Sequence, residues 1–286
     1  MLPSISTVQA CGSVSKPSSP EKNCLFVTYS LDHRIVFETN CLLNGMTITF
    51  FNVWLYNCIM NRPFVFVNVA MTADGKIDTV QRRGAAISSP RDRERVDELR
   101  AGADAVMVGG KTLLDEDPKL TVKSEELRAG RLRRGRSLNP VKVGVVTRAI
   151  IKEDSQFLNT GPADIVIFTT RRTSKRHLSR LTSRGVDVYV DDAEKVNLER
   201  ALATLKELGI ERLMVEGGGT LNFELMRLGL VDEVTAFVAP MIFGGEAAPT
   251  MAAGSGLERS AAIPLQLIEV EKWEDGCVLL KYQFVR

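Results

Sequence analysis

Histidine is scarce in this chain, and the cysteines lack a metal-binding spacing. There are only two histidines, His33 and His177, so a histidine-based metal centre or catalytic triad in the main body would depend on His177 alone. His177 lies in the basic stretch RRTSKRHLSR, where an exposed helical residue is the expected role. The cysteines, none of which forms a Cys-x-x-Cys pair, are Cys11, Cys24, Cys41, Cys58 and Cys277. The composition therefore predicts no metal site, disfavours a hydrolase and is typical of a reduced, cytoplasmic protein.

An excess of one charge is also absent. The 286 residues carry 37 basic and 35 acidic side chains, a formal net charge of +2, so no global nucleic-acid-binding surface is expected. The most apolar stretch, Met46–Ile59, is shorter than the roughly 18 residues of a membrane-spanning helix and is interrupted by Asn52 and Asn57. The opening residues show neither a basic region nor a small-residue cleavage site, so no signal peptide is expected. We therefore expect neither nucleic acid nor membrane as a partner.

The character of the chain changes at Met60. Residues 1–59 contain the Ser/Pro-rich segment Ser13–Pro20 and show no clear amphipathic periodicity. The apolar fraction of 44% is ample for one folded core. We expect one domain at residues 60–286 and an N-terminal extension at residues 1–59, with the native protein starting at Met60. The alternative is that the extension is a β-hairpin that pairs with the domain.

Residues 60–286 alternate short β-rich runs with amphipathic segments. Strands are predicted at Phe64–Ala70, Asp104–Val108, Val141–Thr147, Asp164–Thr169, Val186–Val190 and Arg212–Glu216. Helices are predicted at Ser89–Ala101, Ser174–Arg184, Leu198–Leu208 and Thr220–Leu228. The first helix has Ser89 as its N-cap and Pro90 at its first position. This alternation predicts an α/β fold with a mixed, mostly parallel sheet flanked by helices.

The last third of the chain has a different pattern. The predicted strands Glu233–Ala239, Leu265–Trp273 and Cys277–Phe284 have no helices between them, and Glu274–Gly276 is a hairpin turn signal. We therefore expect antiparallel strands at the C-terminal end of the sheet. The segment Lys123–Pro140 is rich in arginine and poor in apolar residues, which predicts a solvated loop or ragged helix. RNA binding through that segment is the rival interpretation.

The most informative segment is Leu213–Asn222, LMVEGGGTLN. A predicted strand ends at Glu216, three glycines follow, and a helix begins. Glycine lets backbone N–H groups approach an anion, and the helix N-terminus adds partial positive charge, so this turn suits a phosphate. The same pattern also occurs in tight turns that bind nothing.

Two further informative segments follow predicted strands. Gly109–Val122, GGKTLLDEDPKLTV, combines two glycines, the Thr112 hydroxyl and three carboxylates, and its alternative role is an acidic loop that caps a helix. The apolar Leu120 and Val122 argue against that alternative, because they would pin the loop to the edge of the sheet. Ala70–Asp78, AMTADGKID, predicts only a β-turn when taken alone.

Together these segments resemble one family, the pyrimidine reductases of riboflavin biosynthesis. The family includes the archaeal and fungal diaminohydroxyphosphoribosylaminopyrimidine reductases and the reductase half of the bacterial bifunctional deaminase-reductase. The resemblance runs from about Arg62 to Arg286 and includes A-M-T-A-D-G-K-I, S-S-P…V-x-x-L-R-A, G-x-x-T…D-P-x-L-T-V, E-G-G-G-T-L and V-D-E-V…A-P-x-I-x-G-G. The chain has no H-x-E…P-C-x-x-C deaminase signature, so the resemblance implies a stand-alone reductase.

The resemblance implies a dihydrofolate-reductase-like fold with NADPH, or else NADH, lying across the carboxyl ends of the strands. The implied reaction reduces the ribosylamino side chain of a diaminopyrimidinone 5′-phosphate to ribitylamino. The implied cofactor contacts are Ala70, Thr112, Glu116, Thr147, Arg148, Gly217, Gly218, Gly219 and Thr220. Among these, the Gly217–Thr220 turn would cradle the diphosphate, and Arg148 suits the 2′-phosphate of the adenosine ribose.

The implied substrate contacts are Arg100, Leu120, Lys123 and Glu216. Arg100 and Lys123 would bind the phosphate, and Glu216 would accept hydrogen bonds from pyrimidine amines or ribose hydroxyls. Without the family, a cation that complements the helix dipole is nearly as good an interpretation of Arg100.

Two positions depart from the family pattern. Glu116, followed by Asp117, stands where Asp is usual, and Lys123 stands where many bacterial relatives have Arg, which loses a bidentate contact. The proton donor to the imine nitrogen is open between Glu116, Asp117 and an ordered water. The resemblance implies a homodimer and no metal. The rival functions are another NADPH-dependent reductase on the same fold and a nucleotide- or RNA-binding protein.

Overall fold

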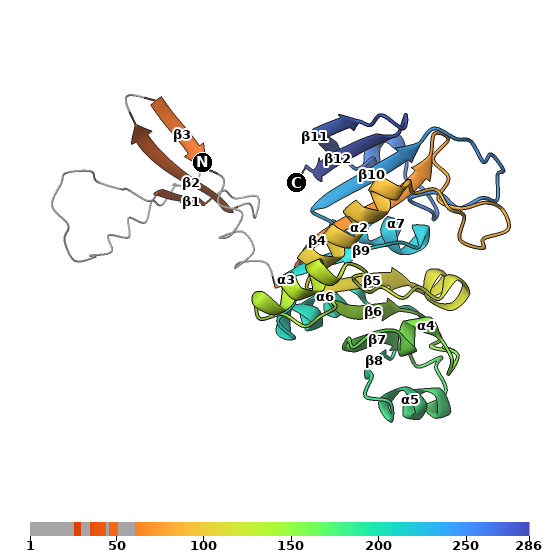
Figure 1. Ribbon diagram of the computed structural model, residues 1–286. Helices are drawn as coiled ribbons and strands as arrows, with labels where there is room; N and C mark the ends of the chain where they lie inside the picture. The colour runs from red at the N-terminus through yellow and green to blue at the C-terminus, as the bar shows by residue number, and fades with distance from the viewer. Residues whose placement is uncertain (1–25, 30–34, 44–45, 51–60, 286) are drawn as a thin grey trace, which may run out of the picture. The chain divides into compact units, whose positions relative to one another are not determined.

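The computed structural model of the chain describes residues 26–29, 35–43, 46–50 and 61–285 (Figure 1). The chain divides into two units, residues 1–60 and 61–286. In the first unit, β1 (Phe26–Tyr29), β2 (Ile35–Leu43) and β3 (Met46–Phe50) form a three-stranded antiparallel sheet. The proposed start at Met60 lies outside the described residues, so the role of the extension stays a prediction.

The second unit is built on a nine-stranded sheet. Its strands are β4 (Phe64–Thr72), β5 (Ala105–Gly109), β6 (Val141–Val145), β7 (Ile165–Thr170), β8 (Asp187–Asp191), β9 (Arg212–Val215), β10 (Glu233–Ala239), β11 (Leu265–Lys272) and β12 (Val278–Phe284). Their order is β11-β12-β10-β4-β9-β5-β6-β7-β8. The strands from β10 to β8 run parallel, whereas β12 and β11 pair antiparallel. The predicted fold class is confirmed.

Helices connect the parallel strands. They are α2 (Pro90–Gly102), α3 (Glu125–Arg133), α4 (Gln156–Asn159), α5 (Lys175–Thr182), α6 (Leu198–Glu207) and α7 (Gly219–Arg227), with a π-helix η1 (Thr112–Glu116) and a 3₁₀ helix η2 (Arg259–Ala261). The predicted start of α2 is confirmed, because the Ser89 hydroxyl accepts a hydrogen bond from the Asp92 amide at 3.3 Å. The short elements α4, η1 and η2 were not predicted, since they are too short to show a periodic pattern.

The central parallel strands are buried on both faces, because their side chains alternate between two hydrophobic clusters, whereas the edge strand β8 exposes Tyr189 and Val190. Val65 and Val67 of β4 belong to the cluster that includes residues of α6 and α7. Phe66, between them, belongs to the opposite cluster, which Val96 and Leu99 of α2 join as partly buried neighbours. All of β5 is buried, as expected for a strand in the middle of a covered parallel sheet.

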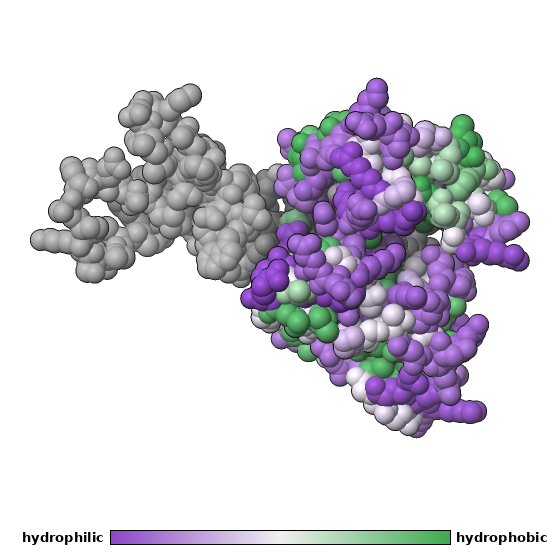
Figure 2. Space-filling model, viewed as in Figure 1, coloured by the Kyte–Doolittle hydropathy of each residue, from purple (hydrophilic) through white to green (hydrophobic). Residues whose placement is uncertain are grey.

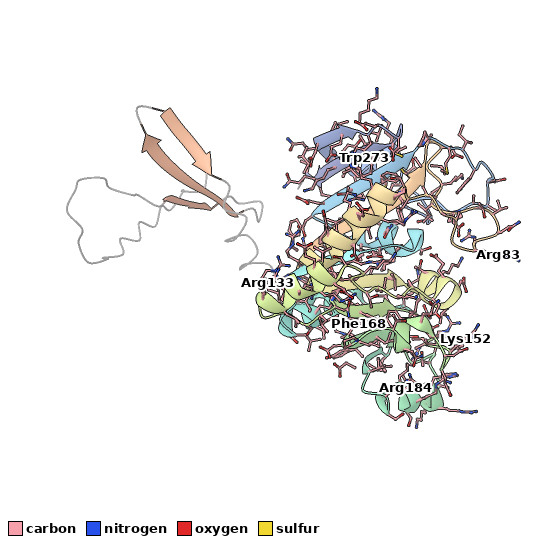
Figure 3. All side chains as sticks on the ribbon, viewed as in Figure 1. Arg83, Arg133, Lys152, Phe168, Arg184 and Trp273 are labelled. Carbon is pink, nitrogen blue, oxygen red and sulfur yellow. The ribbon has the colours of Figure 1, made fainter. Side chains whose placement is uncertain are left out.

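A third cluster closes the antiparallel end of the sheet. Trp273, labelled in Figure 3, packs against Phe237 with ring centroids 5.4 Å apart. The guanidinium of Arg91, at the start of α2, lies 4.2 Å from the Trp273 ring centroid and adds a cation–π contact. The predicted turn Glu274–Gly276 joins β11 to β12 next to this ring. The cluster therefore ties the C-terminal hairpin to α2.

The Lys123–Pro140 segment is more regular than predicted. It contains helix α3, which begins after the N-cap residue Ser124. The Arg131 side chain is only 2% exposed and donates hydrogen bonds to the carbonyls of Ala101 and Ala103 at 3.0 and 2.6 Å. The expectation of a solvated segment is wrong for this residue, because Arg131 binds carbonyls that the C-terminal end of α2 leaves unpaired.

Hydrophilic residues cover most of the face of the second unit that Figure 2 shows. The larger apolar exposures belong to loop residues such as Ile242, which is 75% exposed, and to the edge strand β11, where Val270 is 56% exposed. Within the described parts of the chain, no helix combines the length and apolar character needed to cross a bilayer.

Candidate cofactor and substrate cleft

A cleft of about 1640 Å³ opens where the parallel strands β4, β9, β5 and β6 end side by side. Strand β9 follows β4 and β5 in the chain yet lies between them, and such switch points are where open α/β sheets bind ligands. Pockets for small molecules usually measure about 300–1,000 Å³, so this cleft is larger than a typical single-ligand pocket. It is lined by all the predicted site residues except Leu120, namely Ala70, Arg100, Thr112, Glu116, Lys123, Thr147, Arg148, Glu216, Gly217, Gly218, Gly219 and Thr220.

The Gly217–Thr220 turn has the geometry of an anion cradle. Gly217 and Gly218 have φ angles of +130° and +92°, which residues with a side chain rarely adopt. A Cβ atom at Gly217 would meet no heavy atom within 4 Å, so this backbone borders open space. Helix α7 begins at Gly219 without a side-chain cap, so its first N–H groups are suited to bind a ligand instead. These residues fit a diphosphate.

Close backbone contacts hold this turn in place. The Gly109 amide, at the end of β5, donates to the Gly217 carbonyl at 3.0 Å. On the other side, a Cβ atom at Gly219 would lie 2.3 Å from the Thr250 carbonyl oxygen. Gly219 is therefore required for packing between α7 and the loop that contains Thr250, whereas Gly217 borders the cleft.

The segment after β5 forms the π-helix η1. Such helices are rare in proteins, and those that occur often lie at functional sites. The Thr112 side chain is buried, and Glu116 faces the cleft while remaining open to solvent. Desolvation by the surrounding protein raises the pKa of the Glu116 carboxyl, a hydrogen bond with Thr112 opposes the rise, and the charges of Asp78 and Asp115 add to it. Glu116 therefore holds its proton to a higher pH than an ordinary glutamate.

Asp117 has a different role from Glu116. Its carboxylate accepts hydrogen bonds from the Ser155 hydroxyl at 2.5 Å and from the amides of Gln156 and Phe157 at 2.7 and 3.0 Å. Although burial raises its pKa, these hydrogen bonds prevail and hold the pKa of Asp117 below its usual value. Asp117 thus caps the N-terminus of α4 and does not line the cleft.

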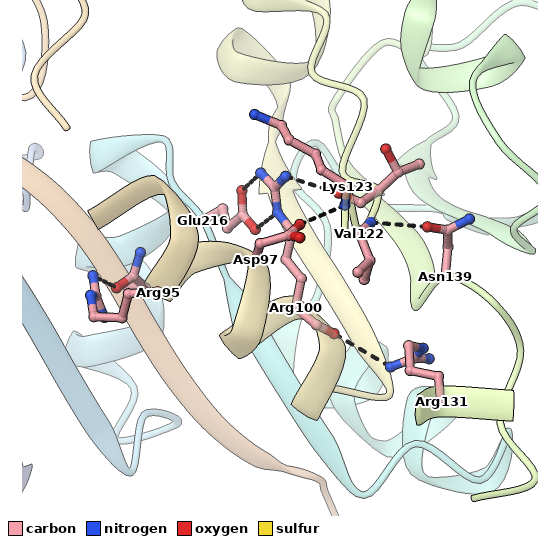
Figure 4. A network of polar contacts seen from close by, with 10 residues as sticks. Arg95, Asp97, Arg100, Val122, Lys123, Arg131, Asn139 and Glu216 are labelled. Carbon is pink, nitrogen blue, oxygen red and sulfur yellow. Dashed lines mark hydrogen bonds and ion pairs between the residues drawn. The ribbon is translucent and has the colours of Figure 1, made fainter. Parts of the chain in front are cut away.

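Arg100 and Glu216 meet in the cleft (Figure 4). The Arg100 Nε lies 2.5 Å from Glu216 Oε1, and Nη2 lies 2.6 Å from Oε2, which makes the ion pair bidentate. Burial lowers the pKa of Arg100, but the negative charge of Glu216 more than compensates, and the pKa is raised. Two residues predicted as separate substrate contacts therefore bind each other, while Arg100 also lies in the last turn of α2, where a cation complements the helix dipole.

Asp97 places Lys123 beside this pair. The Asp97 carboxylate accepts hydrogen bonds from the backbone amides of Lys123 and Ser124 at 2.7 and 2.8 Å (Figure 4). Its carboxylate is therefore occupied by the loop, while the Lys123 side chain stays exposed. Sequence reasoning missed Asp97, and its position three residues before Arg100, on the same helix face, was the available signal.

Leu120 lies apart from the other predicted contacts. Its side chain is 1% exposed and belongs to the hydrophobic cluster that α2 covers. Its φ of +50° is unusual for a leucine and turns the chain from η1 toward Lys123. Sequence reasoning also missed Asp78, which lines the cleft and accepts hydrogen bonds from the amides of Gly84 and Ala85.

The fold and the cleft define an α/β protein with a large cleft at the carboxyl ends of an open, mostly parallel sheet. The family model described as the RibD C-terminal domain matches residues 63–279. The chain belongs to this family, and the resemblance inferred from the sequence motifs is confirmed.

Two archaeal relatives match most of their own length. A protein of Archaeoglobus fulgidus is 40% identical over 202 residues, which are 71% of this chain and 91% of the relative. A protein of Methanothermobacter thermautotrophicus is 41% identical over 207 residues, 72% of this chain and 91% of the relative. Both are named 2,5-diamino-6-ribosylamino-4(3H)-pyrimidinone 5′-phosphate reductase.

Solved structures share the fold. The diaminohydroxyphosphoribosylaminopyrimidine deaminase/5-amino-6-(5-phosphoribosylamino)uracil reductase of Thermotoga maritima matches with a TM-score of 0.63 and 26% identity, over 78% of this chain and 57% of that one. The riboflavin biosynthesis reductase Rib7 of Saccharomyces cerevisiae matches with a TM-score of 0.56 and 18% identity, over 79% of this chain and 91% of that one.

Proposed function

We propose that this chain is an oxidoreductase that reduces 2,5-diamino-6-ribosylamino-4(3H)-pyrimidinone 5′-phosphate to its ribitylamino form in riboflavin biosynthesis. The observation that carries the proposal is one cleft that combines the Gly217–Thr220 turn with the Arg100–Glu216 pair and Lys123. The archaeal relatives with 40% and 41% identity support this substrate.

The cofactor in this proposal is NADPH. The Gly217–Thr220 turn would hold the diphosphate, Ala70 and Thr112 would lie near the nicotinamide, and Thr147 and Arg148 would lie near the adenosine ribose. When bound, the cofactor supplies hydride chemistry. What the protein contributes is position, because the reacting groups must lie in contact and apart from bulk water.

Two cations bind the substrate phosphate in this proposal, Arg100 and Lys123. The pairing with Arg100 fixes the orientation of the Glu216 carboxylate, which keeps acceptor capacity for the amines of the pyrimidine or the hydroxyls of the ribose. Leu120 would contribute through its backbone, since its side chain is buried in the core.

Glu116 is the proton donor that the geometry favours for the imine nitrogen. It lines the cleft and its pKa is raised, so a protonated carboxyl persists at higher pH than usual. Asp117, the other acid considered, uses its carboxylate to cap α4.

The chain acts as a cytoplasmic homodimer in this proposal. The edge strand β11 exposes Leu267, Ile268 and Val270, each at least 44% exposed, and an apolar edge strand favours pairing with another chain. The rival RNA-binding function finds less support. The Arg131 side chain is buried, and Arg128 donates hydrogen bonds to the backbone carbonyls of Val122 and Lys123.

Oxidation of NADPH by the purified full-length chain tests the proposal. Turnover is expected with the diamino ribosylaminopyrimidine 5′-phosphate and not with dihydrofolate. Turnover with dihydrofolate alone would favour another reductase on this fold. Binding of NADPH is measured separately, by quenching of protein fluorescence or by a rise in thermal stability, and the absence of both effects contradicts the proposal.

A further inference from the structure

Three cations line the part of the cleft formed by β6, β7 and β8. They are Arg148, Arg172 and Lys195, and each follows the carboxyl end of one of these strands. Because β6, β7 and β8 are parallel neighbours, the loops that follow them emerge at the same edge of the sheet. Neither Arg172 nor Lys195 belongs to the site that the sequence predicted.

Buried threonines join the loop after β6 to the loop after β7. The Thr147 carbonyl accepts a hydrogen bond from the Thr170 hydroxyl at 2.8 Å. The Ala149 amide donates to the Thr173 hydroxyl at 2.9 Å. Thr170 and Thr173 are 0% and 5% exposed, so solvent does not compete for these bonds. The two loops are therefore held together at two points.

This connection brings Arg148 close to Arg172, because each arginine lies between the two joined residues of its own loop. Glu194 then brings the third loop to them, since its carboxylate pairs with Arg172 at 3.6 Å and with Arg171 at 3.3 Å. Lys195 follows Glu194 directly. Of the two arginines that share Glu194, Arg172 lines the cleft and Arg171 does not.

The chemistry of this cluster suits a phosphate monoester. Arg148, Arg172 and Lys195 carry three positive charges, and Glu194, which pairs with Arg172, is shared with Arg171, so a positive excess remains. A phosphate monoester carries about −1.5 to −2 charges at neutral pH. Guanidinium groups match its oxygens with paired N–H donors, and a lysine adds a point charge. NADPH differs from NADH by such a group on the 2′-oxygen of its adenosine ribose.

We propose that Arg172 and Lys195 complete, together with Arg148, a subsite for the 2′-phosphate of NADPH and thereby select NADPH over NADH. This inference rests on the proposed function, which places a nicotinamide dinucleotide in the cleft. The adenosine end then lies over β6 and β7, while the substrate phosphate is bound by Arg100 and Lys123.

Titration calorimetry on the full-length chain tests this subsite without turnover. The probes are adenosine 2′,5′-bisphosphate, which carries the 2′-phosphate, and 5′-AMP, which lacks it. Arg172→Ala and Lys195→Ala are each expected to raise the Kd of the bisphosphate about tenfold and to leave the Kd of 5′-AMP unchanged. Arg171→Ala is the matched control, because it shares the partner Glu194 but not the cleft, and it is expected to change neither Kd.

Kinetics distinguish the cofactor phosphate from the substrate phosphate. The two variants are expected to lower kcat/KM for NADPH about tenfold, with kcat/KM for NADH and KM for the pyrimidine unchanged. The subsite is overturned, and the proposed function stands, when wild-type protein is active but Arg172→Ala and Arg171→Ala have the same kcat/KM for NADPH. A rise in KM for the pyrimidine alone also overturns it, since the cluster then binds the substrate phosphate. Wild-type protein that binds neither NADPH nor NADH overturns both proposals.

Discussion

The carboxylate of Glu216 and the guanidinium of Arg100 form two parallel hydrogen bonds of 2.5 and 2.6 Å across 116 residues of chain. The side chains are only 12% and 15% exposed, so water screens the pair weakly. Glu216 directly follows β9 and precedes the glycine turn, and Arg100 lies in the last turn of α2. The pair therefore links the proposed cofactor turn to the proposed substrate site.

Replacing Glu216 by alanine is expected to raise KM for the pyrimidine substrate far more than KM for NADPH. The variant loses an acceptor and leaves Arg100 without its ion-pair partner, and hydrogen bonds to charged groups contribute about 1.5–3 kcal/mol. The expected rise in KM for the pyrimidine is thus roughly 10- to 100-fold. Initial rates with each reactant varied in turn measure both constants. Glu98→Ala, on the exposed side of α2, is the control. Equal changes in both KM values argue against the proposed placement.

Glu116→Gln is expected to lower kcat at least about tenfold, since general acid catalysis contributes about 10²–10⁴-fold. In the wild type, kcat should fall as pH rises through the raised pKa of Glu116, above about 4.3, the ordinary value for glutamate. The variant should lack this part of the pH–rate profile. Asp117→Asn should keep the profile and instead lower the melting temperature, because Asp117 caps α4. A Glu116→Gln profile that keeps the same fall contradicts the assignment.

The same raised pKa gives a stability prediction with a defined sign. The folded protein binds the Glu116 proton more tightly than the unfolded chain, so this contribution to stability is present below the unfolded pKa. It is lost as pH rises from that value through the folded pKa. Denaturant titrations of wild type and Glu116→Gln across this range should therefore diverge, with the variant relatively more stable at the higher pH. Parallel curves would show that Glu116 has no raised pKa.

Gly217→Ala is expected to abolish or strongly weaken NADPH binding. The added Cβ atom would point into open space of the cleft, and the φ of +130° strains any side chain. Gly209→Ala is a matched control, since Gly209 has a φ of +83°, open space around its Cβ position and no place in the cleft lining. Both variants should lose roughly 1–3 kcal/mol of stability from strain. Only Gly217→Ala should change fluorescence quenching by NADPH, and equal quenching by both variants contradicts the cradle.

A chain that begins at Met60 is expected to keep the kcat and both KM values of the full-length chain. Every residue proposed for the site lies in the second unit, and the family model begins at residue 63. Side-by-side kinetics of the two chains measures this. A loss of activity that co-expressed residues 1–59 restore would show that the extension belongs to the functional protein.

Much of the fold could be predicted because its signals are local. The start of α2 depends on Ser89 and Pro90, which adjoin the helix. The role of Asp117 could not be predicted, because its partner Ser155 is 38 residues away and belongs to a helix too short to show a pattern. The burial of Arg131 could not be predicted either, since the carbonyls it binds belong to Ala101 at the end of α2 and to Ala103 just after it, both distant along the chain.

The sequence alone determined the order of strands and helices, the glycine turn and the membership of a reductase family, because these depend on neighbouring residues and on motifs in fixed order. Only the tertiary structure decided that Glu116, rather than Asp117, faces the cleft, that Arg100 pairs with Glu216, and that the loop of Arg172 is held to the loop of Arg148. These contacts join segments distant along the chain. They form only where the order of strands in the sheet and the core beneath it overcome the entropy of bringing such segments together.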